Sequence, residues 1–463
     1  MQIIRETTSC DSAPKTDFGI VTPFPPSSRL SAATRALASR YLSGEIGRTV
    51  QQATFALDPA FLKTEPSPNR LYAEAIRLIA EQAPLRILPG ERLAGAATLR
   101  EAMWHSTPLT KYPSISHTTL GFEKLLRVGL RGLRAEIEAR VAKQDLSDEQ
   151  ADFLAAMHTC LEAARTWHSR YVAALELLVE EAPTVEDRPG YAAVLKSLRA
   201  VPENPPRSFR EAIQALWMAW DFQRLCGNWS GIGRIDKMLG PFLRTDLATG
   251  VISLDEAREL LAHFWIKGCE WITAEGRGSG DAQFYQNIVL AGVDESGASV
   301  ANDVTDLVLD VVEELHISDF PIAVRISAST PERLLNRVAA IQRLGGGIIA
   351  IYNEDRIIPN LVKFGYPLED ARNFANDGCW EILIPGKTAF GYQPFDALLP
   401  LQETLGLSES SANPARQKKV ECSDWLAQQR GTGLSEDFPD FESLYTSYVH
   451  NLRQTLEPLF EER

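Results

Sequence analysis

A cysteine and a glutamate two positions apart, Cys379 and Glu381, are the residues of this 463-residue chain best suited to chemistry. Gly378 precedes them, and a glycine at that point lets the backbone turn sharply. A cysteine sulfur that carries an unpaired electron can take hydrogen from an unactivated carbon, and a nearby carboxylate can accept a proton from the neighbouring hydroxyl. The spacing has an ordinary alternative, because a lone cysteine is commonly a small buried apolar residue.

Several motifs occur in order along the chain, and the last of them contains Cys379. They are Ser116-His117-Thr118, Gly233-Arg234-Ile235-Asp236, Tyr285-Gln286-Asn287-Ile288, Ala291-Gly292-Val293-Asp294, Val324-Arg325, Gly345-Gly346-Gly347-Ile348-Ile349-Ala350-Ile351-Tyr352-Asn353-Glu354-Asp355, Leu368-Glu369-Asp370-Ala371-Arg372 and Gly378-Cys379-Trp380-Glu381. In type, order and spacing they resemble the glycyl radical enzyme family, whose best-known member is pyruvate formate-lyase. The resemblance runs along most of the chain.

The resemblance implies an α/β fold, a ten-stranded barrel made of two half-barrels in which a cysteine loop and a glycine loop meet. This chain would supply a helical N-terminal portion, the first half of the barrel and the cysteine loop. Family members are nearly twice as long and carry an Arg-Val-x-Gly-Tyr-like loop, which is not found after Cys379. The similar string that begins at Arg188 precedes Cys379, and we interpret it as a turn between helices. A half-barrel also leaves strand edges that seek another chain.

The resemblance further implies that Cys379 becomes a thiyl radical that abstracts hydrogen from a small substrate, with Glu381 as the base. Members with this Cys-x-Glu order include dehydratases and carbon–nitrogen lyases that act on 1,2-diol or amino-alcohol-like substrates, and some aryl-acetate decarboxylases. Pyruvate formate-lyase itself uses two adjacent cysteines. Trp380 in the second position therefore argues against acetyl transfer from pyruvate.

Three further residues are candidates for substrate binding. Asn228 and Trp229 align with a His-Ser pair that lies at the substrate in the glycerol dehydratase subgroup, and the amide of Asn228 offers a donor and an acceptor. His117 is the third, although a histidine before a helix can equally cap it or satisfy a buried carbonyl. Asp236 beside Arg234 is more typical of a structural ion pair than of a catalytic group.

Two residues beside Cys379 depart from the family pattern. Asp377 stands where an apolar residue is expected, and Trp380 replaces a smaller apolar residue. We interpret Trp380 as packing behind the loop, which is a more common role for a tryptophan than stacking on a substrate. Because of these two departures, the sequence does not identify the substrate.

The partners follow from the same resemblance. We expect no cofactor bound by this chain itself, a glycyl radical on a separate segment or subunit, and a radical S-adenosylmethionine activating enzyme that installs it. The protein is expected to be a dimer that acts on a small molecule. A non-catalytic or truncated homologue acting as an interaction partner is the alternative. Nucleophilic catalysis by Cys379 is a third hypothesis, disfavoured because no histidine partner is recognised near it.

Composition narrows the class of protein. The formal charge of −14 disfavours nucleic acids and anionic membranes as partners. No apolar run is long enough to span a bilayer, and the N-terminus does not resemble a signal peptide, so we expect a cytoplasmic protein. The six cysteines show no Cys-x-x-Cys spacing, which argues against a zinc or iron–sulfur site.

The pattern along the chain predicts an extended N-terminal arm over residues 1–66 and a pyruvate formate-lyase-like domain over 67–463. Within that domain we expect a helical part at about 67–280, the half-barrel and cysteine loop at about 281–400, and a C-terminal loop and helix at 401–463. The predicted helices are Thr119–Ala142, Ser147–Glu181, Ser208–Gln223, Leu254–Lys267, Val304–Leu315, Pro331–Leu344 and Phe441–Phe460, and the predicted strands are Asn287–Ala291, Ile322–Ile326 and Ile348–Tyr352.

Overall fold

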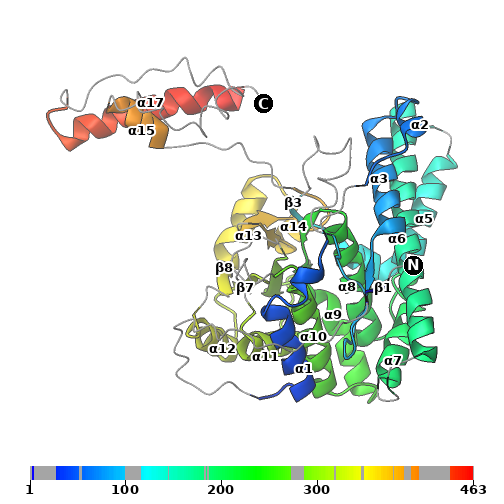
Figure 1. Cartoon of the computed structure of the whole chain (residues 1–463). Helices are drawn as coiled ribbons and strands as arrows, with labels where there is room; N and C mark the ends of the chain where they lie inside the picture. The colour runs from blue at the N-terminus through cyan, green and yellow to red at the C-terminus, as the bar shows by residue number, and fades with distance from the viewer. Residues whose placement is uncertain are drawn as a thin grey trace. The chain divides into compact units, whose positions relative to one another are not determined.

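Helices outnumber strands in the computed structural model, which describes residues 3–4, 28–51, 55–99, 116–143, 145–181, 184, 187–272, 286–317, 320–345, 349–378, 380–389, 398–405 and 438–461 (Figure 1). The helices are α1 (Ala32–Leu42), α2 (Pro59–Leu62), α3 (Pro68–Gln82), α5 (Phe122–Val141), α6 (Asp148–Glu180), α7 (Arg188–Leu198), α8 (Phe209–Leu225), α9 (Ile235–Ala248), α10 (Leu254–Gly268), α11 (Asp303–Leu315), α12 (Glu332–Gln342), α13 (Glu354–Lys363), α14 (Leu368–Arg372), α15 (Leu398–Thr404) and α17 (Phe441–Glu461), with a 3-10 turn, η1, at Gly47–Thr49. The strands are β1 (Ile3–Ile4), β2 (Leu85–Arg86), β3 (Ser116–Thr119), β4 (Trp229–Gly231), β5 (Gly233–Arg234), β6 (Ile288–Ala291), β7 (Ile322–Ile326), β8 (Ile349–Asn353), β9 (Ala375–Asp377) and β10 (Glu381–Leu383). The chain divides into two units, residues 1–390 and 391–463.

A parallel sheet in the order β5-β6-β7-β8 forms the centre of the first unit. Helix α11 connects β6 to β7, and α12 connects β7 to β8, as parallel pairing requires. The register places Ile322 of β7 between Ile288 of β6 and Ile349 of β8. These elements confirm the α/β alternation and the three strands predicted from the sequence. Strand β8 lies at the edge of this sheet, and its Ile351 is 47% exposed.

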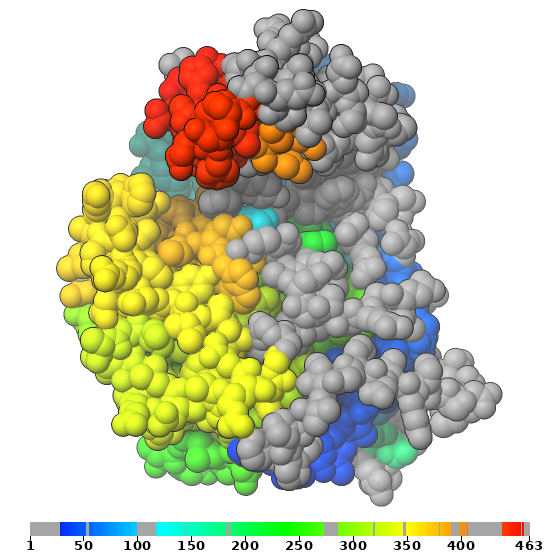
Figure 2. Space-filling model, turned by 90° about the vertical axis from the view of Figure 1, so that its left-hand side faces the viewer, coloured from blue at the N-terminus to red at the C-terminus, as the bar shows by residue number. Residues whose placement is uncertain are grey.

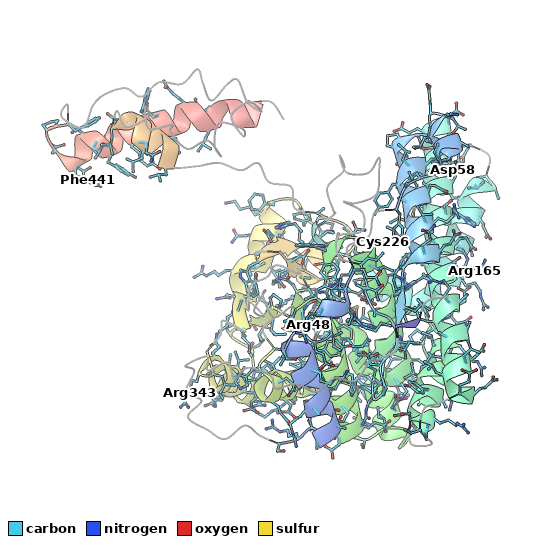
Figure 3. All side chains as sticks on the ribbon, viewed as in Figure 1. Arg48, Asp58, Arg165, Cys226, Arg343 and Phe441 are labelled. Atoms are coloured by element: carbon cyan, nitrogen blue, oxygen red, sulfur yellow. The ribbon has the colours of Figure 1, made fainter. Side chains whose placement is uncertain are left out.

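The sheet packs against helices that carry large aromatic side chains. Trp217 of α8 and Trp265 of α10 are fully buried, and Phe320 lies 4.9 Å from Trp265 between ring centroids. Gly268 ends α10, and a Cβ there would lie 2.0 Å from the ring of Phe320, so only glycine fits. Cys226, which follows α8, is buried (Figure 3). Together with Cys160 it is a free thiol in the described part of the chain.

Helices α3, α6 and α7 form a second layer with its own core beside α8 (Figure 1). Ser147 caps α6 in a capping box with Gln150, at the start of the helix predicted over Ser147–Glu181. Arg188 and Pro189 begin α7, so the interpretation of this string as a turn was wrong. Proline suits the first turn of a helix, because the backbone N–H that it lacks has no partner there.

Helix α1 corrects part of the arm expected over residues 1–66. The Ser31 side chain accepts a hydrogen bond from the backbone N–H of Thr34 and caps the helix. Leu37 and Tyr41 are buried, and the Thr34 hydroxyl donates to Glu259 of α10. An extended conformation is therefore wrong for residues 32–42. The segment Pro23-Phe24-Pro25-Pro26, whose prolines suggested an extended arm, lies outside the described residues.

Helix α5 differs from the continuous helix predicted over Thr119–Ala142. Thr119 lies in β3 instead, and Gly129 breaks the helical geometry with a φ of 67°. A Cβ at Gly129 would lie 2.5 Å from the carbonyl oxygen of Glu203. The backbone N–H of Leu130 bonds to the carbonyl of Pro202 at 2.9 Å, so the break lets a neighbouring loop approach the helix.

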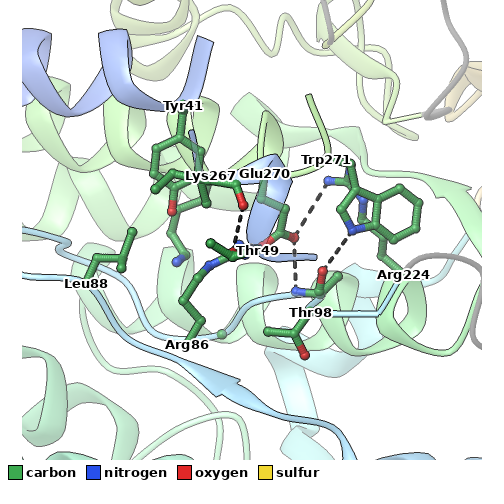
Figure 4. A network of polar contacts seen from close by, with 12 residues as sticks. Tyr41, Thr49, Arg86, Leu88, Thr98, Arg224, Lys267, Glu270 and Trp271 are labelled. Atoms are coloured by element: carbon green, nitrogen blue, oxygen red, sulfur yellow. Dashed lines mark hydrogen bonds and ion pairs between the residues drawn. The ribbon is translucent and has the colours of Figure 1, made fainter. Parts of the chain in front are cut away.

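A network of buried charged groups joins β2 and the segment after it to α10 and the residues that follow α10 (Figure 4). Arg86 and Glu270 form an ion pair at 2.6 Å, and both side chains are fully buried. Glu270 also accepts a hydrogen bond from the backbone N–H of Ala97 at 3.1 Å, and Lys267 pairs with Glu91 at 3.0 Å. Removing one member of such a pair leaves its partner charged and without compensation. The network therefore fixes the N-terminal segments on the helical body.

The α12–α13 segment, in yellow in Figure 2, forms a broad part of the surface of the first unit. The exposed residues there include Val362 and Phe364, which is 83% exposed. In the second unit, α15 and α17 are joined by a hydrogen bond from Asn451 Nδ2 to Thr404 Oγ1 at 2.8 Å. The predicted tail helix is confirmed by α17. Among the helices that the structure describes, none has the length and apolar character needed to cross a bilayer.

Candidate active site

Strands β9 and β10 form an antiparallel hairpin around position 379, in which Asp377 pairs with Glu381. Cys379 itself lies outside the described residues. Gly378 has a φ of 54° and Trp380 a φ of 81°, so the residues on both sides of Cys379 adopt left-handed backbone conformations. This conformation is energetically unfavourable for a residue other than glycine. It persists where the surrounding structure holds the residue in place. The sharp turn expected at Gly378 is therefore present.

Glu381 meets His117, which is one of the candidates from the sequence. Their Oε1 and Nδ1 atoms lie 3.0 Å apart, and His117 is 5% exposed. His117 lies where the register between β3 and β4 shifts, and its own φ is 54°. Bulges of this kind redirect a side chain, and here the bulge accompanies the contact with the carboxylate. The structure thus brings together two residues that are 264 positions apart.

Three side chains that were not predicted as site residues hold the hairpin. Asp377 Oδ2 accepts a hydrogen bond from the backbone N–H of Thr118 at 2.7 Å. Asn287 Nδ2 donates to the carbonyl of Gly378 at 3.2 Å, and the Tyr352 hydroxyl donates to the carbonyl of Trp380 at 2.7 Å. Asn287 and Tyr352 belong to the motifs that carry the family resemblance, and this membership was the signal available for them.

Besides Oδ1 of Asn376, three buried side-chain oxygen atoms around the hairpin have no hydrogen-bond partner within the described residues. They are Oε2 of Glu381, Oδ1 of Asp377 and Oδ1 of Asn287. A buried acceptor without a donor is costly, so it is commonly satisfied by water or by a ligand. A ligand that fits this set carries hydroxyl or amino groups, which can donate to all three oxygens.

Asp377 is fully buried, and burial raises the pKa of its carboxyl to about 8. The backbone N–H groups of Gly378, Thr118 and Gly231 act in the opposite direction but do not offset burial. The ordinary value is 3.8, so the folded chain binds this proton more tightly than the unfolded chain does. The resulting stabilisation is complete below that ordinary value and is lost as the pH rises through about 8.

The Gly-Arg-x-Asp motif has a structural role, as the sequence indicated for Asp236. Asp236 Oδ2 accepts hydrogen bonds from the backbone N–H of Ala291 at 2.6 Å and from the Thr305 hydroxyl at 2.7 Å. Arg234 donates to the carbonyl of Ala291 at 3.0 Å and to Asn373 Oδ1 at 3.2 Å. The motif thus ties β5 to β6 and to the residue after α14.

Arg325 of β7 supports the segment that leads into β9. It donates to the carbonyls of Arg372 at 2.6 Å and Phe374 at 2.8 Å, and it forms an ion pair with Glu354. Burial lowers the pKa of Arg325, as does the charge of Arg234, while Glu354 raises it. Glu354 is therefore the main group that favours the charged form of this buried guanidinium, and Asp236 acts in the same direction.

Trp229 begins the strand beside His117, and Asn228, the other remaining candidate for substrate binding, directly precedes that strand. Trp229 of β4 pairs with Ser116 of β3. Asn228 Nδ2 donates to the Tyr72 hydroxyl of α3 at 3.0 Å, which directs this amide towards the helical layer. No group of three or more His, Cys, Asp or Glu residues that could hold a metal ion occurs in the part of the chain that the structure describes.

Replacing Gly378 by Ala is expected to lower the free energy of unfolding by about 1–2 kcal/mol, because its φ is positive and its new Cβ would lie 2.3 Å from His117 Nδ1. Gly190→Ala is the matched control, since no atom lies within 4 Å of a Cβ at that position in α7. The control should be neutral or stabilising by about 0.5–1 kcal/mol. Urea denaturation of both variants measures the difference, and equal effects would contradict the packed turn.

Residues 73–460 match the pyruvate formate lyase-like family, so the chain belongs to this family. Its relatives are glycyl radical enzymes, among them lyases and dehydratases. The family resemblance read from the sequence is thereby confirmed.

Two curated relatives illustrate the match. The chain is 30% identical to the isethionate sulfite-lyase of Oleidesulfovibrio alaskensis over 286 residues, which are 58% of this chain and 34% of the relative. It is 26% identical to the trans-4-hydroxy-L-proline dehydratase of Clostridioides difficile, over 74% of this chain and 44% of the relative. The match therefore spans less than half the length of either relative.

Solved structures agree on the fold. The glycerol-bound form of the B12-independent glycerol dehydratase from Clostridium butyricum superposes with a TM-score of 0.76 at 21% identity, covering 93% of this chain and 63% of that one. A glycyl radical enzyme from Archaeoglobus fulgidus gives a TM-score of 0.69 at 21% identity, over 92% of this chain and 64% of that one. The α/β fold of the pyruvate formate-lyase type, present in part, is thus confirmed.

Proposed function

We propose that this chain is the cysteine-bearing part of a glycyl radical lyase that acts on a small molecule with a hydroxyl group beside the leaving group. The observation that carries the proposal is the contact at 3.0 Å between Glu381 and His117, on a hairpin whose turn includes position 379. A carboxylate held in this way, with its second oxygen free of partners among the described residues, can accept a proton from a substrate hydroxyl. The relatives named above are lyases and dehydratases, which supports the same class.

In the proposed reaction, Cys379 and Glu381 have separate roles. The thiol of Cys379 would give its hydrogen to a glycyl radical on a partner segment, which a radical S-adenosylmethionine activating enzyme would install. Cys379 then takes a hydrogen atom from the substrate carbon that bears the hydroxyl. Glu381 accepts the hydroxyl proton, the bond to the leaving group breaks with its electron pair on that group, and the product radical regains hydrogen from Cys379. Asn228, Trp229 and His117 are the proposed substrate contacts.

The buried hydrogen-bond acceptors around the hairpin favour substrates that donate hydrogen bonds. The unpartnered oxygens of Glu381, Asp377 and Asn287 suit a diol or an amino alcohol better than a purely anionic compound. We therefore place dehydration and carbon–nitrogen cleavage ahead of decarboxylation. The active protein is proposed to be a cytoplasmic dimer.

Reconstitution tests this function. The chain is combined without oxygen with a glycyl-bearing partner and its activating enzyme, and supplied with propane-1,2-diol, glycerol, trans-4-hydroxy-L-proline or isethionate. We expect turnover of at least one hydroxyl-bearing compound and its loss after brief exposure to air, because oxygen destroys carbon-centred radicals. Turnover that survives air would contradict radical chemistry and favour nucleophilic catalysis by Cys379.

A further inference from the structure

Asp377 lies next to the proposed base but has no part in the mechanism above. We propose that Asp377 is a second acid–base group of this site, one that donates a proton to a departing hydroxyl group while Glu381 accepts a proton. This inference rests on the proposed function and deepens it, because it selects a dehydratase from among the lyases.

The hairpin places the two carboxyl groups together. Asp377 of β9 and Glu381 of β10 are register partners, and directly opposed residues of an antiparallel pair point to the same face. Thr118 and His117, neighbours on β3, hold one group each: the Thr118 N–H bonds Asp377, and His117 bonds Glu381. One oxygen of each carboxyl is thereby fixed. The other oxygen of each is buried and without a partner among the described residues.

The surroundings of Asp377 favour its protonated form. None of the ion pairs among the described residues involves Asp377, so no cation stabilises its carboxylate. The charge of Glu381 raises the pKa of Asp377 further, whereas the backbone N–H of Gly231 in β4 acts in the opposite direction. A Cβ at Gly231 would lie 2.8 Å from Asp377 Oδ1, so the glycine leaves the space that the carboxyl occupies. Burial adds to this by raising the pKa of Asp377 to about 8.

Two carboxyl groups in different environments can act as acid and base at the same pH. In dehydration of a 1,2-diol, Cys379 removes a hydrogen atom from the first carbon and Glu381 removes the proton of its hydroxyl. The second carbon–oxygen bond breaks, its electron pair stays on oxygen, and Asp377 gives that oxygen a proton, so that water leaves. Cys379 returns hydrogen to the product radical, and the proton on Glu381 passes back to Asp377. Sulfite leaves as an anion and needs no such proton.

The first measurement detects the proton on the carboxyl group of Asp377. The infrared difference spectrum between the wild-type chain and Asp377→Asn should contain the carbonyl band of a carboxylic acid at about pH 6, and this band should disappear as the pH rises through about 8. Asn keeps an acceptor for the Thr118 N–H, so the hairpin should remain folded. Absence of the band at about pH 6 would overturn the proposal, and this readout needs neither partner nor substrate.

The second readout is turnover in the reconstituted system. Asp377→Asn should slow dehydration of propane-1,2-diol by about 10²–10⁴-fold, while Asp377→Glu, which keeps the acid, should restore part of the rate. Transfer of solvent deuterium to the partner's glycine, which requires only the thiol, should stay at the wild-type level in both variants. Wild-type dehydration by Asp377→Asn would overturn the proposal. Loss of deuterium transfer from the wild-type protein would instead contradict the proposed function.

Discussion

Replacing Cys379 by Ser is expected to abolish turnover by the reconstituted protein. Serine has nearly the same shape, but its O–H bond is too strong to give hydrogen to a glycyl radical, so the first step of the proposed mechanism cannot occur. The measurement does not depend on knowing the substrate. In heavy water a thiol that exchanges hydrogen with the partner's glycine carries deuterium to that glycine, and the hydrogen splitting in its electron paramagnetic resonance spectrum collapses. The serine variant should keep the splitting.

Cys160→Ser is the matched control. Cys160 lies half-buried in α6, and burial raises the pKa of its thiol to about 11, so it has no reactive thiolate at neutral pH. This variant should exchange deuterium as the wild-type protein does. Binding of the glycyl-bearing partner should be unchanged in both variants. If the wild-type chain binds the partner but shows neither exchange nor turnover, the protein is an interaction partner rather than the catalytic half.

Secondary structure could be predicted where periodicity was strong. Strands β6, β7 and β8 are apolar runs, and α11 and α12 alternate with them, so spacing alone indicated the sheet. Helix α9 was not predicted, because Pro241 lies inside it and proline normally ends a helix. The long-range features also escaped prediction: the break at Gly129 in α5 depends on a carbonyl of Glu203, far along the chain.

In the candidate site, only residues that belong to recognisable sequence motifs could be predicted. Glu381 and His117 were named from the sequence, and the structure places them in contact. Asp377 was noted as a departure from the family pattern, yet its burial and its bond to Thr118 depend on the pairing of distant strands. Asn287 and Tyr352 bind backbone carbonyls of the hairpin, and no local pattern specifies such contacts. The roles of all five candidates stay predictions, namely those of Cys379, Glu381, His117, Asn228 and Trp229.

Replacing Glu354 by Gln is expected to lower the free energy of unfolding by about 3–5 kcal/mol. Gln can still accept the hydrogen bond that Glu354 Oε1 receives from the Val293 N–H at 3.1 Å, so the substitution removes little besides the charge. The guanidinium of Arg325, which is fully buried, then loses its counter-ion and remains near Arg234. An uncompensated buried charge is the costly outcome of breaking such a pair.

Glu136→Gln provides the comparison, because the same chemical change there breaks an exposed ion pair with Lys124. Exposed pairs contribute about 0–1 kcal/mol, so urea denaturation should separate the two variants clearly. Equal effects would contradict the assignment of Glu354 as the counter-ion of Arg325.

The Glu354 variant should also disturb the hairpin before the rest of the sheet. Arg325 holds the carbonyls of Arg372 and Phe374, which lead directly into β9. Weakening those bonds should speed amide hydrogen exchange in β9 and β10 more than in β5 and β6, where the backbone pairing does not depend on this guanidinium. In the reconstituted system turnover should fall as well, because a carboxylate that is no longer held beside His117 accepts the substrate proton less effectively. The ion pair between Arg325 of β7 and Glu354 at the start of α13 would then be linked to the geometry of the proposed base.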